Sequence, residues 1–94
     1  MASVQIIFWK DVPVMVEARE GAEQVTLSLS DRFQQLVDSL AMLQGIHDGD
    51  AYLEHWRRAE AEERPGGARA AGEAVVAELE ERFTDFAARA FGRA

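Results

Sequence analysis

The fold is decided by residues 14–29, whose sequence is VMVEAREGAEQVTLSL. Apolar and polar residues alternate on both sides of Gly21, which is typical of two half-buried strands joined by a tight turn. Glycine suits this turn because it adopts positive φ without a steric penalty. One register places every apolar side chain on the same face: Ala18 opposite Val25, Val16 opposite Leu27, and Val14 opposite Leu29. A slip of one residue would turn one apolar set towards water, so the sequence predicts this register.

A further strand precedes this hairpin, in residues 3–9. Its apolar residues occupy both faces: Val4, Ile6 and Phe8 on one, and Ile7 and Trp9 on the other. Pro13 lacks an amide donor, so it interrupts the pattern and marks a turn or a strand start. Together the segments predict a three-stranded antiparallel meander within residues 3–29.

Helical periodicity follows the strands. The predicted helices lie within residues 31–44, 51–63 and 70–91. Proline at position 65, followed by two glycines, disfavours helical backbone, so we expect a flexible or broken segment at about 64–72. Strands followed by helices indicate an α+β fold in which the three helices pack on one face of the sheet. We expect a single domain over residues 1–94.

The composition is that of an acidic globular chain. Its 94 residues include 17 Asp and Glu, 10 Lys and Arg and no Cys, and the formal net charge is −7. The lack of cysteine excludes disulfides and thiolate zinc sites. An acidic chain is repelled by phosphate backbones and anionic lipids, so we expect neither a nucleic-acid nor a membrane partner. No membrane-spanning run or signal-peptide pattern is found, which predicts a cytoplasmic protein.

No recognised catalytic or metal-binding motif occurs. The serines lack the surroundings of a nucleophile elbow, and there is no glycine-rich phosphate loop. Four candidate metal ligands are close in sequence: His47, Asp48, Asp50 and His55. Their spacing matches neither a calcium loop nor a zinc helix, so we predict no metal site. A small enzyme that uses carboxylates stays open as a third interpretation, although no acidic pair stands out.

Several large apolar residues are left over by this folding pattern. If alternate residues of the first strand face the helices, then Ile7, Trp9 and Met15 face away from them. Met42 lies about half a turn from the apolar stripe of the first helix, so it also points outward. Clustered exposed apolar residues often mark partner surfaces, which predicts an interaction surface here. The alternatives are that the last helix covers these residues, or that the first strand is inverted.

Polar residues near this surface predict specificity. We expect Lys10, Asp11 and Arg57 to provide polar contacts to a partner. A second interpretation is a small-ligand module, with a pocket between the sheet and the second helix near Tyr52, Trp56 and Arg57. Arginine makes forked contacts with anions, so such a pocket suits a planar anionic molecule such as a pterin or a nucleotide. The simpler interpretation of Arg57 is pairing with neighbouring glutamates along a helix.

Three stretches of the chain resemble a known family. They are residues 6–13 (IIFWKDVP), 32–35 (RFQQ) and 50–58 (DAYLEHWRR). Together they are similar to the small bacterial domain called a virulence factor, and to a segment of the longer conserved virulence factor C. The family pattern favours arginine where this chain has Lys10. The resemblance implies no catalytic residue, but it implies an accessory subunit in one-carbon metabolism, next to corrinoid or folate methyl-transfer enzymes.

These observations favour a non-enzymatic interaction protein, either a homodimer or a small accessory subunit of another protein. Binding of a small anionic ligand is the second interpretation, and a carboxylate enzyme is the third. The sequence identifies no cofactor.

Overall fold

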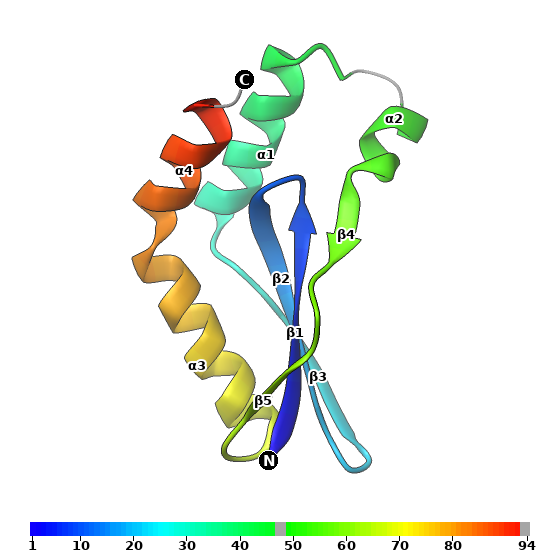
Figure 1. The fold of residues 1–94 in the computed structure, drawn as a ribbon, viewed down its shortest axis with the longest axis vertical. Helices are drawn as coiled ribbons and strands as arrows, with labels where there is room; N and C mark the ends of the chain where they lie inside the picture. Colours follow the sequence, from blue (N-terminus) through cyan, green and yellow to red (C-terminus); the bar gives the residue numbers. More distant parts are fainter. Residues whose placement is uncertain (47–48, 93–94) are drawn as a thin grey trace.

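A computed structural model describes residues 1–46 and 49–92, whose arrangement is shown in Figure 1. The strands are β1 (Ala2–Trp9), β2 (Val12–Glu20), β3 (Glu23–Ser28), β4 (Trp56–Arg58) and β5 (Glu62–Arg64), and the helices are α1 (Asp31–Leu43), α2 (Gly49–Glu54), α3 (Ala68–Glu81) and α4 (Phe83–Gly92). The sheet has the order β3-β2-β1-β4, and β5 also pairs with β1. These pairings are antiparallel, so the predicted α+β class and the β1–β3 meander are confirmed.

The hairpin of β2 and β3 has the predicted register. Ala18 lies opposite Val25, and Val16 lies opposite Leu27. Beyond the end of β3, the Leu29 N–H donates to the Val14 carbonyl at 3.0 Å, which continues the same pairing. The alternation of apolar and polar residues was therefore sufficient to specify this part of the sheet.

The hairpin of β1 and β2 contains an irregularity that the sequence did not specify. Ile7 lies opposite Met15, but the next residue, Phe8, lies opposite Pro13. Val14 is thereby left over as a β-bulge, a position at which a nearby proline is tolerated. The bulge shifts the pairing of the last residues of β1, so that Phe8 lies opposite Pro13 and Trp9 lies opposite Val12.

The prediction of a helix within residues 51–63 is wrong for most of that range. α2 ends at Glu54, and the chain then forms β4 and β5, which add to the outer edge of β1. Between these two strands, the Ala59 N–H donates to the Ile6 carbonyl at 2.9 Å. Backbone groups at a sheet edge need partners, and this pairing overrides the helix propensity of an Ala-, Glu- and Arg-rich segment.

The helix expected within residues 70–91 is divided in two. α3 begins earlier, at Ala68, and α4 begins after Arg82. The break expected at about 64–72 is confined to the residues before Ala68, where Gly66 has a φ of 94°. A left-handed φ of this kind favours glycine, so the turn between β5 and α3 follows from the local sequence.

α3 approaches the sheet closely at Gly72. A Cβ atom on this residue would lie 3.0 Å from Cδ1 of Leu27 and 3.3 Å from Cβ of Ala18. The missing side chain therefore lets α3 lie directly on β2 and β3, and this contact closes one face of the sheet.

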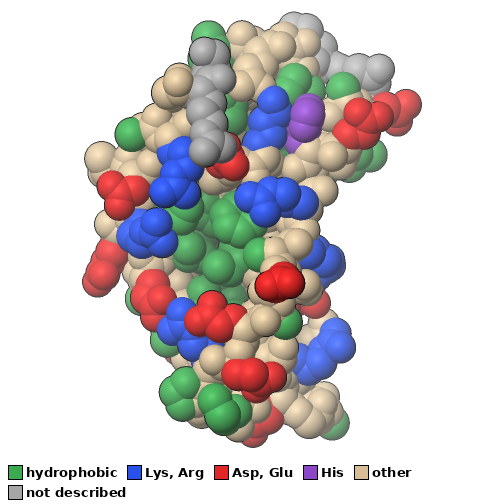
Figure 2. All heavy atoms as spheres, in the orientation of Figure 1, with side chains coloured by type: hydrophobic (Ala, Val, Ile, Leu, Met, Phe, Trp, Pro, Cys, Tyr) green, Lys and Arg blue, Asp and Glu red, His purple; other side chains and the backbone are tan. Residues whose placement is uncertain are grey.

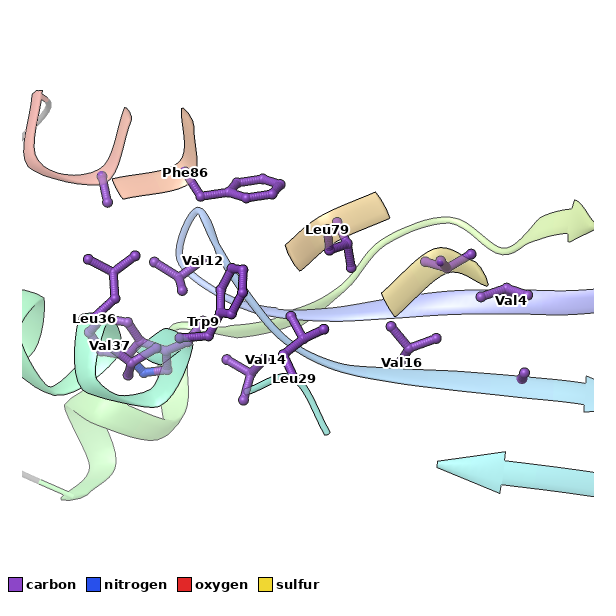
Figure 3. Packing of buried hydrophobic residues seen from close by; sticks show 14 of the residues in the cluster. Val4, Trp9, Val12, Val14, Val16, Leu29, Leu36, Val37, Leu79 and Phe86 are labelled. Carbon is purple, nitrogen blue, oxygen red and sulfur yellow. The ribbon is translucent and has the colours of Figure 1, made fainter. Parts of the chain in front are cut away.

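The helices enclose the core from one side. α3 runs along the sheet, α1 and α4 pack together near the turn between β1 and β2, and α2 lies apart from them beyond β4 (Figure 1). In the same view, Figure 2 shows hydrophobic side chains between α3–α4 and β4. The core combines both layers and also includes Phe33 and Val75. Figure 3 shows its packing, with labels on Val4, Trp9, Val12, Val14, Val16, Leu29, Leu36, Val37, Leu79 and Phe86.

Glu80 connects the end of α3 to the start of α1. The Ser30 N–H and Oγ donate to its carboxylate at 2.6 and 2.8 Å, and Nη2 of Arg32 donates at 3.0 Å. Partial burial acts to raise the pKa of Glu80, but these hydrogen bonds outweigh it, and the pKa lies below its ordinary value of 4.5. The ionised carboxylate therefore stabilises the junction of the two helices.

Candidate functional site

The sheet has a second face, which points away from α3. Alternate residues of the strands share it, because successive side chains point to opposite faces. We call it the open face; it carries Ser3, Gln5 and Ile7 from β1, Met15, Glu17 and Arg19 from β2, Gln24, Thr26 and Ser28 from β3, and Trp56 and Arg58 from β4. One end of this face is polar and the other is largely apolar.

The apolar end is hollowed into a shallow depression of about 510 Å³. It is lined by Ile7, Met15, Trp56, Arg57 and Arg58. Ile7 and Met15 are cross-strand partners, and Arg58 lies opposite Ile7 on the other side. Ile7 is buried, whereas Met15 and Trp56 are half-buried and reach solvent. The structure therefore brings four of the predicted interaction residues together with Arg58, which the sequence had placed in a helix.

A second depression continues from the first. It has a volume of about 280 Å³, shares Met15 and Trp56 with the first, and extends to the start of α1. Its remaining lining residues are Val14, Ser28, Leu29, Ser30, Asp31 and Gln34. The two depressions thus form one groove, with an apolar middle and polar groups at both ends. The sequence did not predict the part of the groove next to α1, because no local pattern indicates where this helix begins relative to the sheet.

The polar part of the open face is an organised network. Nη1 of Arg58 donates to Glu17 at 2.6 Å and to Gln5 at 3.3 Å. Glu17 also accepts from Gln24 at 3.2 Å. The Glu17 carboxylate is therefore held in an ion pair that orients Arg58, which is an arrangement typical of a structural contact.

Trp9 is not on the open surface, and the expectation that it faces solvent is wrong. Its side chain is 0% exposed, and its Nε1 donates to the Tyr52 carbonyl at 2.9 Å. The ring centroid lies 5.2 Å from that of Tyr52 and 5.5 Å from that of His55. α2 covers the indole and satisfies its N–H, which a buried tryptophan requires. The half-exposed indole belongs instead to Trp56, its partner across β1 and β4.

The other predicted residues lie at the end of the sheet. Nε of Arg57 donates to the Lys10 carbonyl at 3.1 Å, and its Nη2 lies 3.9 Å from Asp11. These three residues are neighbours, and the Arg57 guanidinium covers Phe8 at 4.4 Å from the ring centroid. Because Phe8 alternates with Ile7, the guanidinium covers the helix side of β1, although Arg57 also lines the first depression.

Tyr52 and Met42 do not line the groove. Tyr52 packs behind it, with its ring centroid 6.1 Å from that of Trp56. Met42 is exposed, as predicted, at 76%, but it lies near the end of α1 and away from the residues that line the groove.

The remaining candidate features are metal ligands and membrane-spanning helices. Over residues 1–46 and 49–92, no three potential ligands among His, Asp and Glu cluster in a way that could hold a metal ion. His47 and Asp48 lie outside the described residues. In the same part of the chain, no helix has the length and apolar character needed to cross a membrane.

A family model described as a virulence factor matches residues 7–89. The chain belongs to the virulence factor family. The match begins at Ile7 in the groove and extends into α4, so the virulence factor domain includes the residues that line the apolar depression. No curated protein and no solved structure matches the chain significantly. The family name describes no chemical activity.

Proposed function

We propose that this virulence factor domain is an interaction module that binds a partner protein through the groove on its open face. The observation that carries the proposal is the placement of Met15 and Trp56, half-buried on a sheet face that α3 does not cover. The solvent side of an antiparallel sheet is ordinarily polar. Aromatic residues, methionine and arginine are enriched at protein interfaces, and the groove combines all three.

The chemistry of the groove favours an extended segment of a different protein as its occupant. An apolar side chain of that segment would fill the space beside Met15 and Trp56. Arg58, oriented by Glu17, would bind a carbonyl or carboxylate of the segment, and Gln34 and Ser28 would contact polar groups at the other end. A second copy is disfavoured because two chains of net charge −7 repel each other.

The test compares two methionines. Met15→Ser removes the centre of the groove, and Met42→Ser makes the same change on an exposed residue of α1 outside it. Tagged wild-type protein and both variants are used for affinity purification from native cells, after circular dichroism shows that each is folded. The proposal requires one partner that is retained by wild type and Met42→Ser and lost by Met15→Ser. A partner retained equally by all three proteins would contradict it.

The first partners to test are corrinoid- and folate-dependent methyl-transfer enzymes. The family resemblance implies this association, and the purified enzymes can be titrated directly against the wild type. Isothermal titration with Met15→Ser as the comparison separates binding in the groove from binding elsewhere. Heat release that is the same for both proteins would place the enzyme at another surface.

A second candidate function is the binding of a planar anionic ligand in the larger depression. Its volume of about 510 Å³ is within the usual range for ligand sites, and an indole and two arginines border it. A ligand that binds the native state raises the melting temperature. A thermal-shift screen with folates, corrinoids and nucleotides should show stabilisation that Trp56→Ser abolishes. If none of these compounds stabilises the wild type at saturation, the result would count against this function.

A further inference from the structure

A second surface combines apolar and basic side chains on the helix side of β1. Figure 2 shows hydrophobic side chains in the middle of this view, with Lys and Arg side chains along α3–α4 on one side and next to β4 on the other. Ile6 and Phe8 belong to this side, because they alternate with Ile7. Both are half-buried, so α3 and α4 leave this edge of the helix-side face partly uncovered.

The arginines on this surface lie over aromatic rings. The guanidinium of Arg57 lies 4.4 Å from the centroid of Phe8, and those of Arg82 and Arg89 lie 5.0 and 5.8 Å from that of Phe86. Stacking of this kind is favourable and also orients the planar donor groups. We call the set of these five residues and Ile6 the arginine-flanked surface.

These arginines are less closely paired than three arginines elsewhere in the described chain. Arg19, on the open face, also has no ion pair there and donates to Gln24. Arg32, Arg58 and Arg64 each form an ion pair within 3.0 Å with a glutamate, namely Glu80, Glu17 and Glu78. Within the described residues, Arg82 and Arg89 form no ion pair, and Arg57 has only the more distant carboxylate of Asp11, at 3.9 Å. In a chain with 17 acidic residues, cations without a close carboxylate are available for an external anion.

We propose that the arginine-flanked surface binds an acidic amphipathic segment of a partner protein. Apolar residues of the segment would contact Ile6 and Phe8. Its carboxylates would pair with Arg82 and Arg89 on one side and with Arg57 on the other, because arginine binds carboxylates in a bidentate geometry. This surface shares Arg57 with the first depression, but Ile6, Phe8, Arg82 and Arg89 do not line the groove. The inference therefore goes beyond the proposed function.

Two synthetic peptides test the proposal. Both carry leucines at helical spacing, and they carry either glutamate or glutamine at the polar positions. Fluorescence anisotropy measures their binding to wild type, to Arg82→Gln/Arg89→Gln, and to Arg19→Gln/Arg69→Gln. The last variant is the matched control, because it removes the same charge from exposed arginines outside the surface.

The glutamate peptide should bind wild type and the control with similar affinity. The double variant Arg82→Gln/Arg89→Gln should bind it roughly tenfold more weakly, which corresponds to about 1.4 kcal/mol. The glutamine peptide should bind wild type more weakly by a similar factor. Added salt should weaken the glutamate complex, because exposed charges are screened. Met15→Ser should leave this binding unchanged, which separates this proposal from the one for the groove.

Several results would overturn the proposal. They are the absence of binding at about 1 mM glutamate peptide, equal affinity for the two peptides, and an affinity unchanged by the double variant. Displacement of the peptide by a single-stranded oligonucleotide would assign the surface to nucleic acid instead. A dimer in light scattering that Arg82→Gln/Arg89→Gln dissociates would show that the occupant is a second copy of the chain.

Discussion

The two faces of the sheet are built from alternate residues of the same strands, yet they have different surroundings. On the covered face, Val4, Val16 and Ala18 are buried. On the open face, Gln5 and Glu17 join a hydrogen-bonded network that solvent reaches. The comparison shows that a period of two determines which residues share a face. It does not determine what covers the ends of that face.

The two tryptophans show this limit most clearly. Trp9 and Trp56 are direct partners across β1 and β4. The first is fully buried because α2 folds over it, and the second stays half-buried where the two depressions of the groove meet. One indole therefore stabilises the fold, whereas the other is available to a partner.

Removal of the buried indole of Trp9 should have the largest effect on the free energy of unfolding. Trp9→Ala should lower the free energy of unfolding by about 3–5 kcal/mol, because a large core side chain is lost and a cavity is left. The Tyr52 carbonyl also loses its donor. Trp56→Ala should cost only about 1 kcal/mol, since its ring is partly in water already. Urea unfolding followed by far-UV circular dichroism measures both. Equal losses would contradict the contrast between the two tryptophans.

The sequence predicted the parts of the structure that depend on strand alternation. The register of β2 and β3 and the outward placement of Met15 followed from residues 14–29. The burial of Trp9 did not follow, because it depends on α2, which is distant in sequence. β4 was missed for a similar reason: its pairing with the edge of β1 outweighs the local preference of an Ala-, Glu- and Arg-rich segment for helix.

Removal of the Glu80 carboxylate, which connects α3 to α1, should have an intermediate effect on the free energy of unfolding. Glu80→Ala should cost about 1–2 kcal/mol near neutral pH, which is the usual loss when a capping group is removed from the start of a helix. The pKa of Glu80 lies below its ordinary value of 4.5, so its stabilising effect is complete above that value and is lost as the pH falls through the lower, folded-state pKa.

Urea unfolding at several pH values between about 7 and about 3 measures this effect. The wild type should lose stability at the acidic end, and Glu80→Ala should lose less over the same range. Some acid sensitivity should remain, because a hydrogen bond from Arg64 also lowers the pKa of Glu78. Parallel curves for the two proteins would show that Glu80 does not contribute through its charge.

Removal of the ion pair between Arg58 and Glu17 on the open face should have the smallest effect on the free energy of unfolding. Arg58→Gln should change the free energy of unfolding by less than about 1 kcal/mol, because exposed salt bridges contribute little. The side chain of Arg58 is 55% exposed, and that of Glu17 is 18% exposed. Chemical denaturation provides the value. A loss as large as that of Trp9→Ala would mean that the open face is covered in solution.

Acrylamide quenching of tryptophan fluorescence tests the central claim most directly. Trp56→Phe leaves Trp9 as the only tryptophan, and Trp9→Phe leaves Trp56 as the only tryptophan, so each can be excited selectively over Tyr52. In folded protein, Trp9 should be protected from the quencher and Trp56 should be quenched readily, and both should become equally accessible in urea. Equal protection of the two indoles in the native state would contradict the account, because it would mean that the groove on the open face is closed.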